Sequence, residues 1–241
     1  GQMQLAAEEE GVPALGYVVS YRALQSVLDA ALARTGVALR HGLTATSVGG
    51  TPAYAAVELE GAETDPLLAR LAAIADGTGA AVTGIMRRRH DYGQVALIAK
   101  VWRSMPHDGL AYERFTPDGP IALLPERDHY GLVWTVTPSL AEALLALADA
   151  AFLAQLALHF GVRTGGFTQV AERRVFPLAL EFASDPVRAR CLVLGNAAQT
   201  LHPVAGQGFN VGLRDAWELS EIIVDTPREG LGNHAMLDRY R

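Results

Sequence analysis

The sequence predicts a mixed α/β fold with α+β character, in which a mainly antiparallel sheet is inserted into a partial Rossmann-like layer. Three observations favour it. Residues 1–89 alternate between helix-like and strand-like patterns, residues 90–178 hold four short strand-like segments and a long apolar helix pattern, and residues 179–241 contain a strand, a glycine-rich turn and a helix. We expect these three ranges to be the parts of the fold.

The first part begins with an amphipathic helix over residues 21–34. Ser20 is a suitable N-cap, apolar residues follow at helical spacing, and Gly36 comes after the last turn. We expect the apolar stripe of this helix to face a sheet. The segments VALRH and AYAAVELE then predict strands, and the run LLARLAAIADG predicts a buried strand that stops at the turn Asp76-Gly77.

The middle part has the pattern of an antiparallel sheet. Its strand-like segments are QVALIAKV, LAYERFT, PIALLP and GLVWTV, and TPDGP between the second and third is typical of a hairpin turn. Pro138 starts a long helix over residues 139–160, and Gly161 ends it. The segment TQVAERRVFPL predicts a further strand.

The last part combines a buried strand with a helix. The near-continuous apolar run in RCLVLGN is typical of a parallel strand, and Cys191 within it is expected to be buried. After the glycine-rich turn, one helical face is formed by Leu213, Ala216, Trp217, Ser220, Ile223 and Val224.

Composition excludes several classes of function. The chain has 241 residues, 50% of them hydrophobic, and a net charge of −6 without a basic stripe, which argues against nucleic-acid binding. Residues 140–160 are apolar but include Glu142, Asp149 and Gln155, which argue against a membrane span. A single cysteine and no opening signal peptide favour a cytoplasmic protein.

Metal and hydrolase chemistry find no support either. The seven histidines lack metal-ligand spacing, so we expect no metal site, and no G-x-S-x-G elbow is present. His202 lies beside Pro203 and is a candidate to face a substrate, with a structural or solvent-exposed role as an equal alternative.

The string GNAAQTLHPVAGQGFNVG carries the chemistry. It lies between a buried strand and a helix, so its backbone amides and the helix N-terminus point out of the carboxyl end of the sheet. Gly206 and Gly208 remove side chains where a flat or charged group could approach, and the helix dipole favours an anion there by about 0.3 to 1 kcal/mol. A tight strand-to-helix turn is the alternative explanation of the glycines alone.

The full string resembles the second flavin-binding motif of the class A flavoprotein aromatic hydroxylases, G-D-A-A-H, Pro, G-Q-G-x-N-x-G and Asp. The residues of this motif are most similar to those of the ubiquinone-biosynthesis branch, in particular the 2-polyprenyl-6-methoxyphenol hydroxylases. GYVVSYRALQSVL, IADGT, AYERFTPDGPIALLP and LVWTVTP are similar in order and spacing, so the resemblance covers nearly the whole chain.

The resemblance implies a set of FAD-binding residues. Asp76 and Gly77 match a motif near the pyrophosphate, although Asp-Gly is also ordinary turn chemistry. Arg22 matches a cofactor-contacting position, with a solvated arginine as an equal alternative. Pro203 matches the proline whose carbonyl faces the substrate, which makes it the candidate catalytic residue. The amides beside the flavin pyrimidine are implied to come from Gly206, Gln207, Gly208, Phe209 and Asn210.

Two positions depart from the commoner family pattern. Asn196 stands where an Asp usually accepts hydrogen bonds from the ribityl hydroxyls, and an amide can keep such a contact without the charge. Gln199 replaces the usual His. Both residues resemble the pattern of the ubiquinone-biosynthesis branch, so we interpret them as marks of that subfamily.

The family's first strand, its G-x-G-x-x-G turn and the following helix are not in this sequence, which also lacks an initiator Met. We therefore expect a fragment that purifies with little or no FAD and that self-associates through uncovered strand edges.

The resemblance implies an FAD-dependent monooxygenase that uses NAD(P)H and O2 to hydroxylate a polyprenylated phenol in ubiquinone biosynthesis. The antiparallel middle is expected to form the floor under an apolar substrate. Membrane contact at the periphery, a homo-oligomer and a place in a biosynthetic complex are left open. Two rival functions remain, a sister flavin monooxygenase acting on another aromatic substrate and a non-catalytic subunit of that complex.

Overall fold

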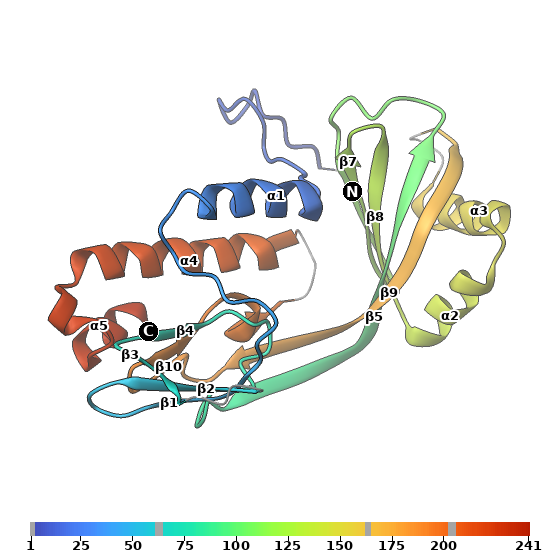
Figure 1. Cartoon of the computed structure of the whole chain (residues 1–241). Coiled ribbons are helices and arrows are strands. Elements are labelled where there is room, and N and C mark those ends of the chain that lie inside the picture. Colours follow the sequence, from blue (N-terminus) through green and yellow to red (C-terminus); the bar gives the residue numbers. More distant parts are fainter. Residues whose placement is uncertain (1–2, 61–64, 162–164, 202–205) are drawn as a thin grey trace. The chain divides into compact units, whose positions relative to one another are not determined.

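The chain was analysed as a computed structural model, which describes residues 3–60, 65–161, 165–201 and 206–241. It divides into two compact units, which are described separately (Figure 1). Unit 1 consists of Gly1–Leu39 and Val95–Phe176, and unit 2 consists of Arg40–Gln94 and Pro177–Arg241.

Unit 1 contains most of a six-stranded sheet with the strand order β12-β9-β5-β8-β7-β6. Neighbouring strands from β5 to β6 pair antiparallel, with Leu97 opposite Trp134 and Leu123 opposite Leu132. The predicted antiparallel middle is therefore confirmed. The strands are β5 (Arg87–Arg103), β6 (Tyr112–Thr116), β7 (Gly119–Glu126), β8 (His129–Val136), β9 (Phe167–Ala183) and β12 (Gln199–Thr200).

The predicted hairpin turn is the connection between β6 and β7. Thr116 pairs with Gly119, and the Thr116 hydroxyl donates to the Gly119 carbonyl at 2.7 Å. Gly119 has a φ of 138°, and a Cβ at this position would lie 2.9 Å from Cγ2 of Thr135. Only glycine fits here, because both the backbone conformation and the close approach to β8 exclude a side chain.

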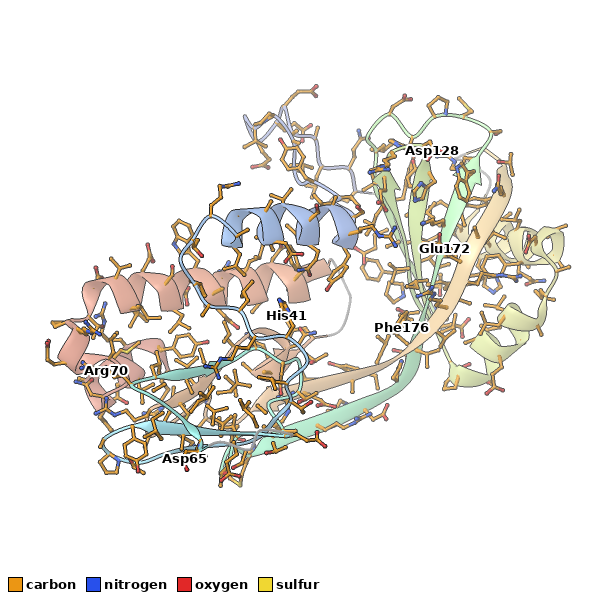
Figure 2. The ribbon with its side chains drawn as sticks, viewed as in Figure 1. His41, Asp65, Arg70, Asp128, Glu172 and Phe176 are labelled. Atoms are coloured by element: carbon orange, nitrogen blue, oxygen red, sulfur yellow. The ribbon has the colours of Figure 1, made fainter. Side chains whose placement is uncertain are left out.

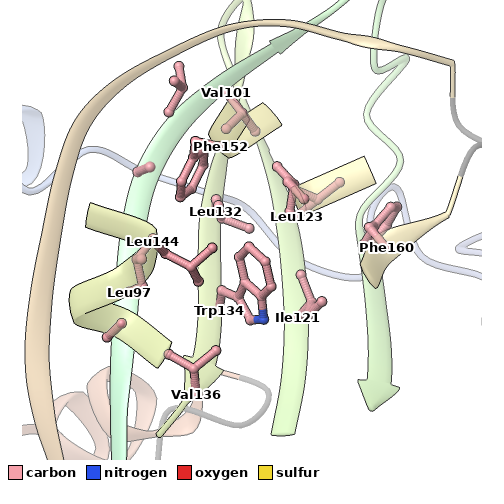
Figure 3. Close-up of a cluster of buried hydrophobic side chains, with 14 of the residues drawn as sticks. Leu97, Val101, Ile121, Leu123, Leu132, Trp134, Val136, Leu144, Phe152 and Phe160 are labelled. Atoms are coloured by element: carbon pink, nitrogen blue, oxygen red, sulfur yellow. The ribbon is translucent and has the colours of Figure 1, made fainter. Parts of the chain in front are cut away.

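One face of the sheet packs against helices α2 (Pro138–Ala146) and α3 (Asp149–Phe160) (Figure 3). Alternate residues of the strands point into this core, as period-2 patterning requires. Each large apolar side chain buried here contributes about 1.5 to 3 kcal/mol. The fully buried members include Leu97, Val101, Ile121, Leu123, Trp134, Val136, Phe152 and Leu156.

The expected single helix over residues 139–160 is wrong, because the chain breaks it at Leu147. This residue has an extended ψ of 143° between α2 and α3. Arg173 of β9 donates to the carbonyls of Leu144 at 3.3 Å and Leu147 at 2.7 Å, and it pairs with Asp149 at 2.9 Å. The guanidinium thus donates to carbonyls at the break, including that of Leu144, which also accepts from the Leu147 amide at 3.3 Å.

Three polar side-chain contacts also lie on this sheet, outside the apolar core. The Trp102 indole donates to Asp128 at 3.2 Å, and Lys100 pairs with Glu172 at 2.5 Å (Figure 2). His129 lies beside Asp128 at 3.1 Å. These contacts link β5, β8 and β9 through side chains rather than through the apolar core.

Unit 2 is built from short strands and two helices. β1, β2 and β3 form an antiparallel sheet, whereas β4 pairs parallel with β11, which pairs antiparallel with β10. Its elements are β1 (Ala45–Gly50), β2 (Ala55–Leu59), β3 (Leu67–Ala69), β4 (Ala72–Ile74), β10 (Val187–Arg188), β11 (Cys191–Val193), α4 (Gln207–Asp225) and α5 (His234–Tyr240).

Two predictions about strands near the start of unit 2 need correction. The segment VALRH is irregular, and the run LLARLAAIADG forms the two strands β3 and β4 instead of one. Arg70 lies between them, where its backbone carbonyl comes so close to Gly232 that a Cβ on the glycine would clash. The parallel β11 and the burial of Cys191 are confirmed.

Two of the predicted helices form close to their expected positions, but their sequence patterns do not show which residues are buried. In α1 (Tyr21–Leu32), Ser20 accepts from Ala23 N at 3.3 Å, yet within the described structure no residue of the helix is buried. In α4, Trp217 is 68% exposed, whereas Leu219 and Ile222 pack with residues of α5. Both helices carry apolar residues on more than one side, so their sequence patterns did not identify the buried face.

Candidate cofactor-binding site

The candidate site begins where the two parallel strands of unit 2 end. Ile74 of β4 lies opposite Val193 of β11, and the amide of Leu194 donates to the Ile74 carbonyl at 3.0 Å. The turn that contains Asp76 and Gly77 follows β4, and the turn that contains Gly195 and Asn196 follows β11. Because parallel strands end at the same edge, these sequence-distant turns are brought together at the carboxyl edge, where α/β proteins bind ligands.

The first turn is shaped by the Asp76 carboxylate. It accepts hydrogen bonds from the amides of Thr78 at 2.8 Å and Gly79 at 2.6 Å, and from the Thr78 hydroxyl at 3.1 Å. Partial burial acts to raise the pKa of Asp76, but these hydrogen bonds and the Arg87 charge outweigh it and hold the pKa below its usual value. Gly77 has a φ of 83°, which favours glycine.

The second turn is a short 3-10 helix, Gly195–Ala197, that lies against α4. The Gly195 amide donates to the Asp215 carboxylate of α4 at 2.9 Å. A Cβ on Gly212 of α4 would lie 3.4 Å from Cα of Gly195, so glycines allow the two backbones to come close. The side chain of Asn196 is exposed beside this contact.

Helix α4 begins with an open N-terminus. Gly206 has a φ of 60°, and among the described residues no side chain caps the helix. No described atom lies within 4 Å of the place that a Cβ would take on Gly206 or Gly208. Within the described structure the first amides of the helix thus have no side-chain cap, and the two glycines have room around them, which fits the approach of an anionic or flat cofactor.

The predicted site residues fall into three groups. Asp76, Gly77 and Asn196 meet at the edge of the parallel strands. A second group, at the start of α4, consists of Gly206, Gln207, Gly208, Phe209 and Asn210.

The third group consists of Arg22, Pro203 and His202. Arg22 lies on the exposed first turn of α1 in unit 1, so its cofactor contact stays a prediction. Pro203 and His202 lie outside the described residues.

Sequence reasoning missed the side chains that support the turns. Asp215 was noted only as the end of a motif, yet its carboxylate holds the Gly195 amide. Tyr240 of α5 donates to the Val193 carbonyl at 3.2 Å, and burial raises the pKa of its hydroxyl. Arg87 contacts the Gly195–Ala197 turn from β5. No pattern in the sequence marks Tyr240 or Arg87.

The described part of the chain has neither a metal cluster nor a membrane-spanning helix. No group of three or more His, Cys, Asp or Glu residues there could hold a metal ion. None of its helices combines the length and the apolar character needed to cross a bilayer.

Glycine turns at the carboxyl edge of a parallel strand pair, with an uncapped helix N-terminus close by, define an α/β protein of the class that binds nucleotide cofactors. Residues 3–241 match the family described as FAD binding domain, and the chain belongs to that family. Membership confirms the predicted resemblance to FAD-dependent hydroxylases, and the residues of the two turns fit the cofactor for which the family is named.

Named relatives agree with this family. The chain is 41% identical over 178 residues to ubiquinone hydroxylase UbiL of Rhodospirillum rubrum, covering 71% of this chain and 42% of that protein. It is 33% identical to 3-demethoxyubiquinol 3-hydroxylase of Escherichia coli, covering 98% of this chain and 61% of that protein. The chain thus spans about half the length of these relatives.

Solved structures support the fold. The p-nitrophenol 4-monooxygenase PnpA from Pseudomonas putida superposes with a TM-score of 0.71 at 18% identity, over 92% of this chain and 58% of that one. Klebsiella pneumoniae HpxO, complexed with FAD and uric acid, gives a TM-score of 0.67 at 19% identity, over 92% of this chain and 58% of that one. The predicted fold class is confirmed.

Proposed function

We propose that the protein containing this chain is an FAD-dependent monooxygenase that hydroxylates the ring of a polyprenylated phenol in ubiquinone biosynthesis. NAD(P)H and O2 are the co-substrates, and the reaction yields the hydroxylated phenol, water and NAD(P)+. Membership of the FAD binding domain family and the names of the relatives support this function. The structural observation that carries it is the start of α4, where no described side chain caps the helix and no described residue outside the helix and the adjoining residues comes within 4 Å of a Cβ placed on Gly206 or Gly208.

The described residues would hold the cofactor through their backbone. The first amides of α4 donate toward an anionic or carbonyl group, and Asn196 offers an amide that can both donate and accept. Asp76 holds its own turn in shape through the Thr78 and Gly79 amides. FAD, when bound, supplies the redox chemistry that moves electrons from NAD(P)H to O2.

An apolar surface in unit 1 supports the choice of a hydrophobic substrate. Ile98, Val133 and Ala122 are cross-strand neighbours on the face of the sheet opposite the buried core, and all three are half-buried. Phe176 of β9 is 48% exposed (Figure 2). A face of this kind can lie against an aromatic ring with a prenyl tail and exclude water from it.

The test uses the full-length protein. We expect it to purify with FAD and to oxidise NAD(P)H in the presence of O2 and a short-chain polyprenylated phenol. Mass spectrometry of a reaction under 18O2 should show one labelled oxygen in the product. A full-length protein that binds no FAD would instead support the non-catalytic subunit.

The position of the new hydroxyl separates the proposal from its closest rival. A sister monooxygenase would also bind FAD and consume O2, but it would leave this phenol unchanged or hydroxylate another aromatic compound. NMR of the product ring, with several phenols offered in parallel, distinguishes these outcomes.

We also propose a peripheral contact with a bilayer, because the substrate is hydrophobic. Co-sedimentation of the full-length protein with phospholipid vesicles that contain the substrate tests this contact, and recovery in the supernatant contradicts it.

We further propose a homo-oligomer and a place in a complex of biosynthetic proteins. Size-exclusion chromatography with light scattering tests the homo-oligomer, and the same measurement with the other biosynthetic proteins added tests the complex.

A further inference from the structure

Arg87 of β5 contacts the turn that follows β11. Its Nη1 donates to the Ala197 carbonyl, and its Nη2 donates to the Asn196 carbonyl at 3.3 Å. The side chain is only 19% exposed. One guanidinium therefore holds two successive carbonyls of the Gly195–Ala197 turn, on the backbone that also carries the exposed Asn196 side chain.

The turn that contains Asp76 and Gly79 packs against the same guanidinium. A Cβ on Gly79 would lie 3.3 Å from Nη1 of Arg87 and 3.0 Å from the Ala197 carbonyl oxygen. Gly79 is also the residue whose amide donates to Asp76 at 2.6 Å. The Asp76 turn and the Asn196 turn thus meet at Arg87, and the arginine charge is one of the influences that keep Asp76 ionised.

A carboxylate on the neighbouring strand orients Arg87. Glu181 of β9 lies 3.4 Å from Nη2 of Arg87 and accepts from Arg89 at 2.9 Å. Arg89 is two residues further along the same strand, and its side chain is 57% exposed. The contacts described for Arg89 are with the carboxylates of Glu181 and Asp91. Arg87 and Arg89 therefore share Glu181 but differ in their contact with the turn.

We infer that Arg87 is a positioning residue for FAD, which fixes the turns of Asp76 and Asn196 relative to each other; this inference rests on the proposed function. A guanidinium is suited to the task because its planar set of donors can hold two carbonyls at once, and its charge strengthens each hydrogen bond. A lysine at this position keeps the charge but has no planar fork. Arg87 itself need not touch the cofactor.

The test compares three variants of the full-length protein, Arg87→Gln, Arg87→Lys and the control Arg89→Gln. We expect Arg87→Gln to raise the Kd for FAD about tenfold or more, because two carbonyls lose a charged donor, and Arg87→Lys to give an intermediate value. Arg89→Gln should stay within about twofold of the wild type, because the Arg89 side chain is 57% exposed and its described ion pairs are with Glu181 and Asp91 rather than with the turn. Quenching of flavin fluorescence measures each Kd.

Two further readouts separate positioning from general stability. Hydrogen exchange of the apo-protein should show faster exchange at residues 195–198 and 77–80 in Arg87→Gln than in Arg89→Gln. The absorption spectrum of saturated FAD should change in Arg87→Gln and not in Arg89→Gln. A purely structural arginine would lower the Tm of the apo-protein while leaving the spectrum and the Kd unchanged, and that result would overturn the inference.

The remaining outcomes are also decisive. If Arg87→Gln does not fold, the same comparison is made with Arg87→Lys, whose Kd must still exceed that of Arg89→Gln. If the wild type binds FAD and the Arg87 variants bind it equally well, the positioning role fails and the proposed function stands. If the wild type binds no FAD, both fail.

Discussion

Units 1 and 2 are stabilised in different ways. The strands that lie wholly in unit 1 have five to eight residues, the 17-residue strands β5 and β9 continue from it into unit 2, and alternate side chains of the unit 1 strands form one continuous apolar core. The strands that lie wholly in unit 2 are two to six residues long, and its elements are linked by arginines that donate to backbone carbonyls. Unit 2 also has two small apolar clusters, and polar links of this kind hold the turns of the candidate site, as in the contact of Arg87 with the Ala197 carbonyl.

The arginine links of unit 2 follow a common pattern. Arg190 donates to the carbonyls of Pro52 at 2.8 Å and Leu231 at 2.7 Å, joining segments that are far apart in the sequence. Arg188 donates to the Gly84 carbonyl at 2.8 Å. Each link depends on one side chain, so single substitutions can separate the contributions that these contacts make.

The largest expected effect is in the core of unit 1. Trp134→Ala should lower the free energy of unfolding by about 3 to 5 kcal/mol, because it leaves a large cavity at a fully buried position. Trp217→Ala is the control, since that side chain is 68% exposed and should cost less than about 1 kcal/mol. Urea denaturation measures both, and equal losses would contradict the buried core.

A smaller effect is expected from the polar links of unit 2. Arg190→Gln should lower the free energy of unfolding by about 1.5 to 3 kcal/mol, because carbonyls of Pro52 and Leu231 lose a charged donor. Arg70→Gln, which removes an exposed contact with the Arg228 carbonyl, should cost less. If both variants unfold at the wild-type denaturant midpoint, the arginines do not hold unit 2 together.

Gly208 allows binding to be separated from stability. Gly208→Leu should leave the fold intact, and can stabilise α4 by up to about 1 kcal/mol, because leucine is the better helix former. The new side chain would occupy the open space at the helix start and raise the Kd for FAD about tenfold or more. Fluorescence titration and a thermal melt are made on the same sample. Unchanged FAD affinity would place the cofactor elsewhere.

The smallest expected effect is a pH dependence at Asp76. Because its folded-state pKa is lowered, this carboxylate stabilises the fold above its unfolded pKa, and the contribution disappears as the pH falls through the folded value. The effect should stay below about 1 kcal/mol, since the residue is exposed and solvent screens it. The advantage of the wild type over Asp76→Asn should shrink between about pH 6 and pH 3. A constant difference would contradict this account.

The contrast between the apolar core of unit 1 and the polar links of unit 2 explains which features the sequence could predict. In unit 1, period-2 patterns and the TPDGP turn predicted the strands and the hairpin, because burial of alternate residues determines both. The break at Leu147 was missed since it depends on Arg173, a residue distant in the sequence that supplies the hydrogen bonds. In unit 2, the glycine motif predicted the turn and the start of α4.

The supporting residues of the site could not be predicted. Arg87 and Arg89 belong to one run of arginines, and only the folded chain shows that the first reaches the Asn196 turn while the second is mostly exposed. The sequence pattern of α4 did not show which of its faces is buried for a related reason, because Leu219 packs with residues of α5, whose position is a property of the tertiary fold.

The contact between Gly195 and Gly212 joins backbone to backbone without a side chain that could yield. The hydrogen bond from the Gly195 amide to the Asp215 carboxylate ties α4 to the same turn. We therefore expect a substitution that shifts α4 to move the neighbouring Asn196 as well, and so to change FAD binding without touching the cofactor.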